Sequence, residues 1–446
     1  MEMYLGLITS FCLLIFGVFK NLSIGYMLLI CWGIFVVICL RRGFTIKNIF
    51  KISFMGAKES FIVLKTLILI GALTATWLSC GTIPAIVYYC TNLIKPNTFI
   101  LSVFLVCSIT SFLIGSSLGT ASIVGIPLLI IAKSGNVNLN MVAGAVIAGA
   151  YFGDRCSPVS SSAALVVALT NTNLFTNIKN MLKTSIIPFL LAIVFYFSLS
   201  IYEPLNIFNN NLANELLNEF HIQPIMLMPA IIIVVLSIFK VKINVSIPFS
   251  IFSAVFLSIF LQKYQLSEII YHIFFGFKLE SGNSLQNIIK GGGILSMLKT
   301  CLLTIVSFSL SSLFEEIKIY DGMKRILLKR QLGEHELFGL TSIVSILTGA
   351  FSCNQPTSTV MTCKIMKDCY SENKVEADKL ALDLENSAIL LSALIPWSVT
   401  PLVVTSSMNI DMSGFIPYGF YLYILPLTHF IYLRYFSRSN KLQLSA

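Results

Sequence analysis

Long stretches without a charged residue constrain this chain more than any other feature. A helix needs roughly 20 apolar residues to cross a hydrocarbon core of about 30 Å. Charged residues make up only 11% of the 446 positions, too few to cover the surface of a soluble domain. The uncharged stretches are residues 3–19, 21–40, 66–94, 96–132, 134–153, 156–178, 184–202, 221–239, 243–262, 300–314, 337–363, 386–410 and 412–433. They predict an all-α polytopic membrane protein with about 10–13 membrane elements.

Residue types that usually carry enzyme chemistry form no catalytic pattern here. The four histidines lack metal-ligand spacing, and no nucleophile, nucleotide or P-loop signature is present, which argues against a built-in ATP motor. We therefore expect no enzyme activity and no cofactor. A membrane-embedded enzyme or scaffold is the least favoured alternative, because no paired catalytic constellation exists. The 11 cysteines are an odd number and lie largely in apolar stretches, so we expect no disulfide framework.

Basic residues indicate the orientation, because Lys and Arg accumulate in short cytoplasmic loops. The excess of 30 Lys and Arg over 20 Asp and Glu fits such loops and favours the lipid bilayer, not nucleic acid, as the partner. The basic segments are 41–58, 179–183, 240–242, 318–330 and the tail 434–441. Segment 203–221 holds three Glu and no Lys or Arg, so we expect the connecting loop 206–221 outside. Both termini of this multi-pass plasma-membrane protein are then cytoplasmic.

Similar patterns recur in the two halves of the chain. Lys65 and Lys299 each open an apolar helix with the motif Leu-Lys-Thr, and 299 − 65 = 234. The offset is 349 − 115 = 234 for two glycines and 392 − 157 = 235 for two serines. These matches predict a duplicated unit with halves 1–205 and 222–446, although apolar helices can also resemble one another by chance.

The basic loops show how the two halves are oriented. Segment 41–58 precedes its apolar helix, whereas segment 318–330 follows the corresponding one. The halves are therefore expected to cross the bilayer in opposite directions. Inverted repeats of this kind are the usual build of secondary transporters.

Four polar stretches interrupt the apolar segments in two pairs. Residues 115–120 pair with 349–359, and residues 153–162 pair with 385–398. Irregular backbone within a bilayer is tolerated only where it is buried in protein or lines a cavity. Proline contributes because it removes a backbone donor and frees carbonyl groups. The residues predicted to break helices are Gly115, Gly119, Pro158, Pro356 and Pro396.

Asp154 is the most informative ionisable residue of these stretches. A charged residue in a membrane segment costs roughly 2.5 to 3.5 kcal/mol on insertion scales and is by default a candidate for ion or proton handling. A carboxylate that binds either a proton or a cation would couple the two fluxes. The alternative is a local ion pair of Asp154 with Arg155 at a cytoplasmic helix end.

Hydroxyl and amide groups near Asp154 offer the oxygen ligands that small hard cations prefer. Glu385 is a second candidate carboxylate, although it lies at the edge of a charged loop. The predicted ion-binding residues are Asp154, Ser157, Ser160, Ser161, Ser162, Asn354, Gln355, Glu385, Asn386 and Ser387. Half-helix N-termini in the same cavity would suit an anionic group instead.

At these residues the sequence resembles the NhaC family of Na⁺/H⁺ antiporters. The segment 144–183, GAVIAGAYFGDRCSPVSSSAALVVALTNTNLFTNIKNMLK, is similar to that family's signature region. Segments 291–300, GGGILSMLKT, and 384–399, LENSAILLSALIPWSV, look like its corresponding segments in the second half. The likeness extends from about residue 60 to the C-terminus. It implies a secondary transporter with two inverted repeats and paired broken elements near mid-membrane. Members exchange Na⁺ for H⁺, and some carry organic anions or amino acids.

Two departures from the family pattern concern the site. The family's Gly-Asp and Ser-Pro fall on residues 153–154 and 157–158. Where many members have an acidic residue and an Asn, this chain has Ser161 and Ala164, and a common Gly-Asp-Gln is here residues 353–355, Cys-Asn-Gln. Two carboxylates are therefore missing, which weakens the Coulomb attraction for a bare cation.

The function predicted from these observations is a cation/proton antiporter that works by alternating access, with Na⁺ and H⁺ as the transported ions. The runner-up is an ion-coupled transporter of an amino acid or small organic acid. The expected partners are the lipid bilayer and a small cation or small organic solute. The oligomeric state stays open, with a homodimer as one alternative.

Overall fold

The computed structural model describes residues 2–20, 22, 24–93, 95–205, 210–239, 241, 243–279, 286, 289–317, 327, 331–408 and 410–435. This part of the chain is almost entirely helical, which confirms the all-α polytopic membrane class. Several sequence expectations concern residues outside it: Lys240, Lys242, most of segment 318–330, residues 206–209 of the connecting loop, and the tail beyond Tyr435.

The helices follow one another along the chain with short connections. The first half contains α1 (Glu2–Phe19), α2 (Ile24–Arg41), α3 (Ile46–Glu59), α4 (Phe61–Ser79), α5 (Thr82–Leu93), α6 (Phe99–Ile114), α7 (Ser117–Thr120), α8 (Ile126–Ser134), α9 (Leu139–Cys156), α10 (Ser161–Thr170) and α11 (Leu174–Tyr202). The second half contains α12 (Asn210–Glu219), α13 (Met228–Ile238), α14 (Ile243–Phe260), α15 (Leu266–Phe275), α16 (Leu298–Glu316), α18 (Glu334–Ser352), α19 (Gln355–Glu372), α20 (Ala377–Leu384), α21 (Val399–Met408) and α22 (Phe420–Tyr435).

Shorter elements complete the chain. Two π-helical segments are η2 (Ala121–Gly125) and η6 (Glu385–Ile389). The 3₁₀ turns are η1 (Pro96–Thr98), η3 (Pro224–Leu227), η5 (Ile294–Met297), η7 (Ser392–Leu394) and η8 (Ile416–Tyr418). Strands β1 (Phe277–Lys278) and β2 (Lys290–Gly291) pair antiparallel.

Among the described residues, seven helical segments are long and apolar enough to cross a membrane. They are Ile24–Arg41, Pro96–Ile114, Ser117–Ser134, Leu174–Tyr202, Ile243–Phe260, Ile294–Glu316 and Ala377–Ser407. The bent pair α3 and α4 makes up to eight, and four shorter apolar helices accompany them. Full-length spans are fewer than the 10–13 elements expected, because several apolar runs are divided into short helices at polar breaks.

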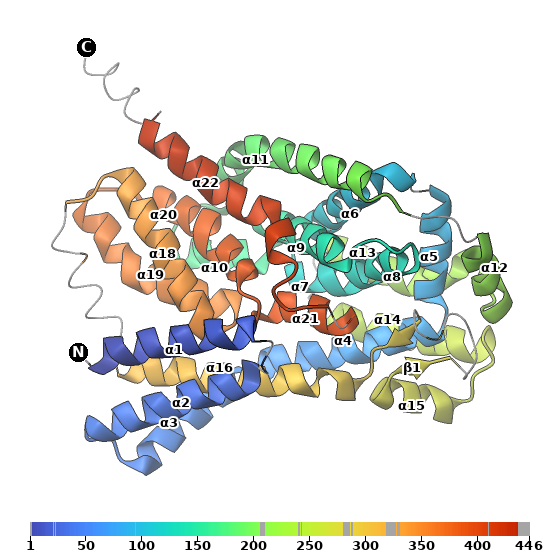
Figure 1. Ribbon diagram of the computed structural model, residues 1–446, viewed down its shortest axis with the longest axis horizontal. Helices are drawn as coiled ribbons and strands as arrows, with labels where there is room; N and C mark the ends of the chain where they lie inside the picture. The colour runs from blue at the N-terminus through green and yellow to red at the C-terminus, as the bar shows by residue number, and fades with distance from the viewer. Residues whose placement is uncertain are drawn as a thin grey trace.

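The long helices run roughly side by side along the molecule (Figure 1). Helix α1 begins and α22 ends at the same end of the bundle, whereas α12 and α15 lie at the opposite end. An ion pair of 3.3 Å between Arg41 and Glu2 ties the end of α2 to the start of α1. The described parts of the two chain ends thus lie at the same end of the bundle (Figure 1).

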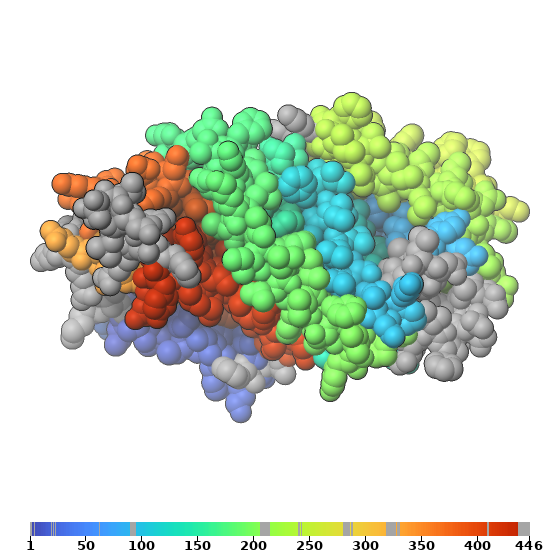
Figure 2. Space-filling view, turned by 90° about the horizontal axis from the view of Figure 1, so that it is seen from above, coloured from blue at the N-terminus to red at the C-terminus, as the bar shows by residue number. Residues whose placement is uncertain are grey.

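Helix α11 covers one face of the bundle between α22 and α6 (Figure 2). Its outward side chains are large and apolar, with Ile187 65% and Val194 63% exposed. Such a surface would be unfavourable in water but suits contact with lipid chains.

Helices α6 and α9 approach closely because two glycines lie between them. A Cβ at Gly149 would lie 2.6 Å from the carbonyl oxygen of Phe104, and one at Gly153 would collide with Ser111 and Phe112. The hydroxyl of Ser111 also donates to the carbonyl of Ala150 on α9. This packing buries the last turn of α9.

Helix ends recur in the two halves at a separation of 238 residues. Gly115 ends α6 and Cys353 ends α18, both with left-handed backbone (φ 67° and 52°), and 353 − 115 = 238. Helix α10 corresponds in the same way to α21, since 399 − 161 = 238 and 408 − 170 = 238. The prolines at positions 158 and 396 also differ by 396 − 158 = 238.

This separation is four residues larger than the offset of 234 found in the sequence patterns. The sequence match paired Gly115 with Gly349, both small residues. In the structure Cys353, and not Gly349, occupies the left-handed position that ends the helix. A left-handed backbone is unfavourable for a residue with a Cβ, so sequence comparison favours the glycine at that position.

Candidate functional site

Asp154 lies in the last turn of α9 and is 3% exposed. The hydroxyls of Ser160 and Ser162 each donate to its Oδ1 at 3.0 Å. The amide Nε2 of Gln355 lies 3.5 Å from its Oδ2, and Ser117 hydrogen-bonds to the same carboxyl group. The carboxyl group is therefore surrounded by polar groups from α7, the start of α10 and α19.

The break between α9 and α10 brings these hydroxyls to the carboxylate. Ser157 ends α9 in an extended conformation, Pro158 follows in the turn, and Ser160 caps α10 by accepting hydrogen bonds from the amides of Ser162 and Ala163. Because the chain leaves the helix here, the hydroxyls of Ser160 and Ser162 reach the carboxylate at the end of α9.

The first-half breaks contact each other directly. A Cβ at Gly115 would lie 2.7 Å from the carbonyl carbon of Val159 and 2.8 Å from the nitrogen of Ser160. Glycine at this left-handed position permits a close approach that any side chain would prevent. The end of α6 thereby holds the turn that carries Ser160.

The second-half breaks form a similar contact. The amide of Val399 donates to the carbonyl of Cys353 at 3.1 Å, and the indole of Trp397 donates to the carbonyl of Ala350 at 2.7 Å. Pro356 lies in the first turn of α19 and is exposed, so this proline begins a helix and does not interrupt one.

Glu385 begins the π-helical segment η6 and is fully buried. Within the described part of the chain, neither of its carboxyl oxygens has a hydrogen-bond partner. The next residue, Asn386, accepts a hydrogen bond from Arg155, while its Nδ2 has no partner among the described residues.

Arg155 is fully buried beside Asp154 and joins four elements. Its Nη1 donates to the hydroxyl of Ser185 at 2.5 Å and to Tyr421 at 3.4 Å. Its Nη2 donates to Thr184 at 3.0 Å and to Asn386. In the described residues no ion pair joins Arg155 to Asp154, so the local pair considered from the sequence is not what the structure contains.

The structure does not bring every predicted residue to the carboxylate. Ser161 is exposed at the start of α10. Ser387 instead donates to the backbone carbonyl of Asp383 at 2.6 Å and accepts from Ser345 on α18. Gly119 lies inside α7, where its amide donates to the capping hydroxyl of Ser116.

Ser157 and Asn354 also have local roles. Ser157 is buried, and its hydroxyl accepts from the amide of Val159. Asn354 is partly exposed and begins α19 without a side-chain cap.

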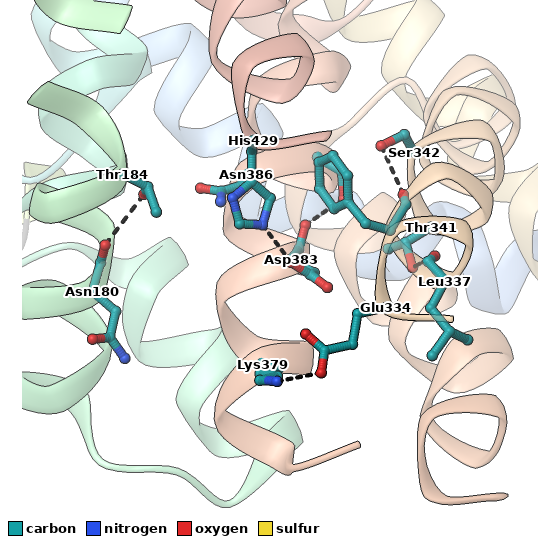
Figure 3. Close-up of polar contacts among 12 residues, drawn as sticks. Asn180, Thr184, Glu334, Leu337, Thr341, Ser342, Lys379, Asp383, Asn386 and His429 are labelled. Atoms are coloured by element: carbon teal, nitrogen blue, oxygen red, sulfur yellow. Dashed lines mark hydrogen bonds and ion pairs between the residues drawn. The ribbon is translucent and has the colours of Figure 1, made fainter. Parts of the chain in front are cut away.

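A second buried polar cluster surrounds Asp383 (Figure 3 shows Asp383 and His429). His429 Nε2 lies 2.8 Å from Oδ1 of Asp383, and the hydroxyl of Tyr370 donates to Oδ2 of the same carboxylate at 2.8 Å. The sequence indicates only that the four histidines lack metal-ligand spacing, so it does not predict this pair. The available signal was Asp383 itself, an acidic residue between two leucines in the last turn of α20.

This cluster lines a cavity of about 560 Å³ bounded by α11, α18, α19, α20 and α22. Thr184 lines the same cavity and accepts a hydrogen bond from Arg155. At its rim, Lys379 and Glu334 form an ion pair of 2.6 Å (Figure 3). The cavity therefore extends to the residues that bind the guanidinium.

The donor set around Asp154 does not resemble a resident metal centre. The described ranges contain no group of three His, Cys, Asp or Glu residues arranged to hold a metal ion. One carboxylate among hydroxyl and amide groups is instead suited to bind a small hard cation weakly enough to release it.

The part of the chain that carries this site is similar to known proteins. A model of the Na⁺/H⁺ antiporter family matches residues 149–437. The chain is 28% identical over 423 residues to the malate-2H⁺/Na⁺-lactate antiporter of Bacillus subtilis, covering 93% of this chain and 89% of that protein.

Two further relatives are similar over most of their length. The Na⁺/H⁺ antiporter NhaC of Bacillus subtilis is 27% identical over 391 residues, covering 86% of each chain. The arginine/ornithine antiporter ArcD of Halobacterium salinarum is 24% identical over 431 residues, covering 91% of this chain and 87% of that protein.

Proposed function

We propose, from the premise that this chain belongs to the Na⁺/H⁺ antiporter family, that Asp154 is the group at which a cation and a proton compete. The chain is a secondary transporter and not an enzyme. The observation that carries the assignment is a buried carboxylate, surrounded by hydroxyls at broken helix ends and not paired with Arg155. Na⁺ is the first candidate cation.

The exchange follows from the chemistry of one carboxyl group. Ionised Asp154, with the hydroxyls of Ser160 and Ser162, offers oxygen ligands to a small cation, and the amide of Gln355 reaches the same carboxylate. Protonation removes the negative charge and one ligand, so the same site cannot hold both ions. Each passage of a cation in one direction is then coupled to return of the protonated form.

We further infer that alternating access uses two inverted-topology repeats, residues 1–205 and 222–446. The recurrence of helix ends at 238 residues supports this, and so does the similar backbone of Ser116 (φ −151°, ψ 118°) and Asn354 (φ −144°, ψ 129°), since 354 − 116 = 238. Pseudo-symmetric halves provide two arrangements of similar energy. The site then opens to either side of the plasma membrane.

The cavity beside Arg155 is proposed as the cytoplasmic access route. Lys183 lines it, and the basic segment 179–183 belongs to the side that the positive-inside rule assigns to the cytoplasm. Both chain ends are assigned to this side, and the acidic segment 203–221 to the other.

A second candidate function is ion-coupled transport of a small organic acid or amino acid. The observation in its favour is Asn354, where the family pattern has an acidic residue, because it directly precedes Gln355 at the site and leaves fewer charges there for a bare cation. A relative named as a malate-2H⁺/Na⁺-lactate antiporter is consistent with it.

Proton movement in inside-out membrane vesicles tests the first function. Na⁺, Li⁺ or K⁺ added to vesicles with an established pH gradient should release protons from the lumen, and Asp154→Asn should abolish the response. If none of the three cations releases protons, and the Asp154→Asn variant behaves like the wild type, the proposal is contradicted. Uptake of radiolabelled lactate, malate and arginine in the same vesicles tests the second function.

A further inference from the structure

We propose that a groove between α9 and α11 binds one anionic phospholipid, with its headgroup held by Lys179 and Lys183 and an acyl chain along α11. The groove lies on the outer face of the bundle that α11 covers (Figure 2). This binding site is separate from Asp154 and goes beyond the proposed exchange. Its apolar wall, two lysines without an acidic partner and their level in the bilayer support it.

The wall of the groove suits hydrocarbon. The groove has a volume of about 470 Å³, and its apolar lining consists of Phe152 from α9 and Phe175, Ile178, Leu182, Ile186 and Phe189 from α11. The ring centroids of Phe152 and Phe189 lie 4.5 Å apart, so both helices contribute to the wall. Phe175, Leu182 and Ile186 are exposed, so the groove is open to lipid. Because apolar side chains offer no hydrogen bonds, the part of a ligand that packs against them must itself be apolar.

Two lysines line the same groove. Lys179 and Lys183 are exposed and four residues apart, so they lie on one face of α11. Among the described residues neither lysine forms an ion pair. Two neighbouring ammonium groups without an acidic partner attract a negatively charged headgroup, and each contributes about 1 kcal/mol near an anionic membrane surface. The charge of the groove therefore selects an anionic lipid.

The lysines lie at the level of lipid headgroups. Residues 184–202 contain no charged residue, and a helix of that length spans about 28 Å, close to the thickness of a hydrocarbon core. Lys183 therefore lies at the edge of the core and Lys179 one turn outside it. Ile186 and Phe189 lie about one and two turns deeper, where the acyl chain of a lipid held by the lysines would run.

The leaflet follows from the orientation proposed above. The basic segment 179–183 belongs to the side assigned to the cytoplasm, and the cytoplasmic leaflet carries the negative surface potential of anionic lipids. The ligand is therefore expected in the leaflet where such lipids are available.

The groove adjoins the groups that hold Arg155. Ser185 lines the groove, and its hydroxyl accepts a hydrogen bond from Arg155 at 2.5 Å. Lys183 lines both the groove and the cavity beside Arg155. A bound headgroup would thus lie at the edge of that cavity, and the chain would lie beside a residue that binds the guanidinium.

Two other occupants would also fit an apolar groove on this face. Bulk lipid would fill it without regard to headgroup charge. A second copy of the chain would cover it and exclude lipid. These occupants predict different binding results from those of a specific anionic lipid.

The test uses the full chain, delipidated in a neutral detergent, and three probes: phosphatidylglycerol, phosphatidylcholine with the same acyl chains, and glycerol 3-phosphate. Native mass spectrometry counts the bound lipids, and thermal unfolding measures how strongly each probe stabilises the protein. We expect one tightly bound phosphatidylglycerol per chain, with an affinity about tenfold or more above that of phosphatidylcholine. Glycerol 3-phosphate should not compete, because it has no acyl chain to pack in the groove.

Two variants separate the contributions of charge and shape. Lys179→Gln with Lys183→Gln should lower the affinity for phosphatidylglycerol by about tenfold or more, to that for phosphatidylcholine. Ile186→Trp should weaken the binding of both lipids several-fold, because the larger ring occupies the groove.

Lys47→Gln with Lys51→Gln is the matched control. These lysines are exposed, have the same spacing on α3 and belong to a basic segment assigned to the same side of the membrane. They line neither the groove nor the cavity beside Arg155. The control should therefore keep the wild-type preference for phosphatidylglycerol.

Equal affinity of the wild type for both lipids would assign the groove to bulk lipid and overturn the inference. An equal loss in the two double lysine variants, or full competition by glycerol 3-phosphate, would overturn it as well. A lipid-free dimer that cross-links through Leu182→Cys would assign the groove to a second copy. Lipid binding is measured without transport, so these results do not depend on whether exchange occurs at Asp154.

Discussion

The side-chain amide of Gln355 lies 3.5 Å from Oδ2 of Asp154, although the two residues are 201 positions apart in the chain. Asp154 belongs to the end of α9 in the first half, and Gln355 begins α19 in the second half. The contact joins the two halves at the proposed ion site. A movement of one half against the other would therefore change the ligands offered to a cation.

The first prediction concerns this contact. Gln355→Leu removes an amide that reaches Asp154 from the opposite half, so apparent Na⁺ affinity should fall about threefold to tenfold without loss of folded protein. Cation titration of proton movement in vesicles measures the change. Gln331→Leu, an exposed glutamine outside the site, should keep wild-type affinity. Equal affinity in both variants would show that Gln355 contributes no ligand.

The second prediction concerns the break after α6. Gly115→Ala introduces a Cβ at a left-handed position and 2.7 Å from the backbone of Val159, so it should destabilise the protein by at least about 1–2 kcal/mol and displace Ser160. Thermal unfolding in detergent and the exchange assay should both reveal the loss.

Gly33→Ala is the matched control for that substitution. Gly33 lies inside α2 with nothing within 4 Å of an added Cβ, so alanine should be neutral or stabilising by up to about 1 kcal/mol. If both alanine variants melt alike, close approach at Gly115 does not matter.

The third prediction concerns the buried pair of Asp383 and His429. Asp383→Asn leaves His429 and Tyr370 without their carboxylate, and should cost about 3 kcal/mol of unfolding free energy. A double-mutant cycle with His429→Gln should give a coupling of about 1–3 kcal/mol in thermal unfolding. The exposed pair of Glu315 and Lys364 serves as a comparison, where Glu315→Gln should change stability by less than about 0.5 kcal/mol. Additive effects of the Asp383 and His429 substitutions would argue against a direct interaction.

The fourth prediction concerns the cavity beside Arg155. A cysteine at Asn180, which lines the cavity, should react with a membrane-impermeant maleimide in inside-out vesicles and not in right-side-out ones. The background is Cys12→Ser, since Cys12 is exposed and the other described free cysteines are buried. A cysteine at Tyr202, 79% exposed at the far end of α11, should show the opposite preference. The reverse pattern would invert the proposed orientation.

Much of the fold is readable from local composition. Uncharged stretches mark the membrane helices, because a bilayer accepts only segments whose backbone hydrogen bonds are satisfied internally. The stretches around Gly115, Pro158 and Pro396 mark helix ends, because glycine and proline change the backbone locally. Asp154 was recognisable as a site candidate because an acidic residue in such a stretch is costly.

The side-chain contacts of these residues could not be predicted in this way. Ser161 and Ser162 are neighbours of the same type, yet only Ser162 reaches Asp154, since the helix turn directs their side chains differently. Arg155 follows Asp154 directly in the chain but binds Asn386, 231 residues away. Such contacts depend on how distant helices pack, which no local pattern records.

By itself the sequence therefore determined that this chain is a polytopic helical membrane protein with interrupted helices and an acidic residue at one of the interruptions. The tertiary structure alone decided that Gln355 and Asn386 from the second half meet Asp154 and Arg155 from the first. The reason is physical: transfer into a bilayer and helix termination depend on neighbouring residues in the chain. Side-chain contacts depend on the close approach of distant parts of the chain, which here requires glycines such as Gly149 and Gly115 where the backbones meet.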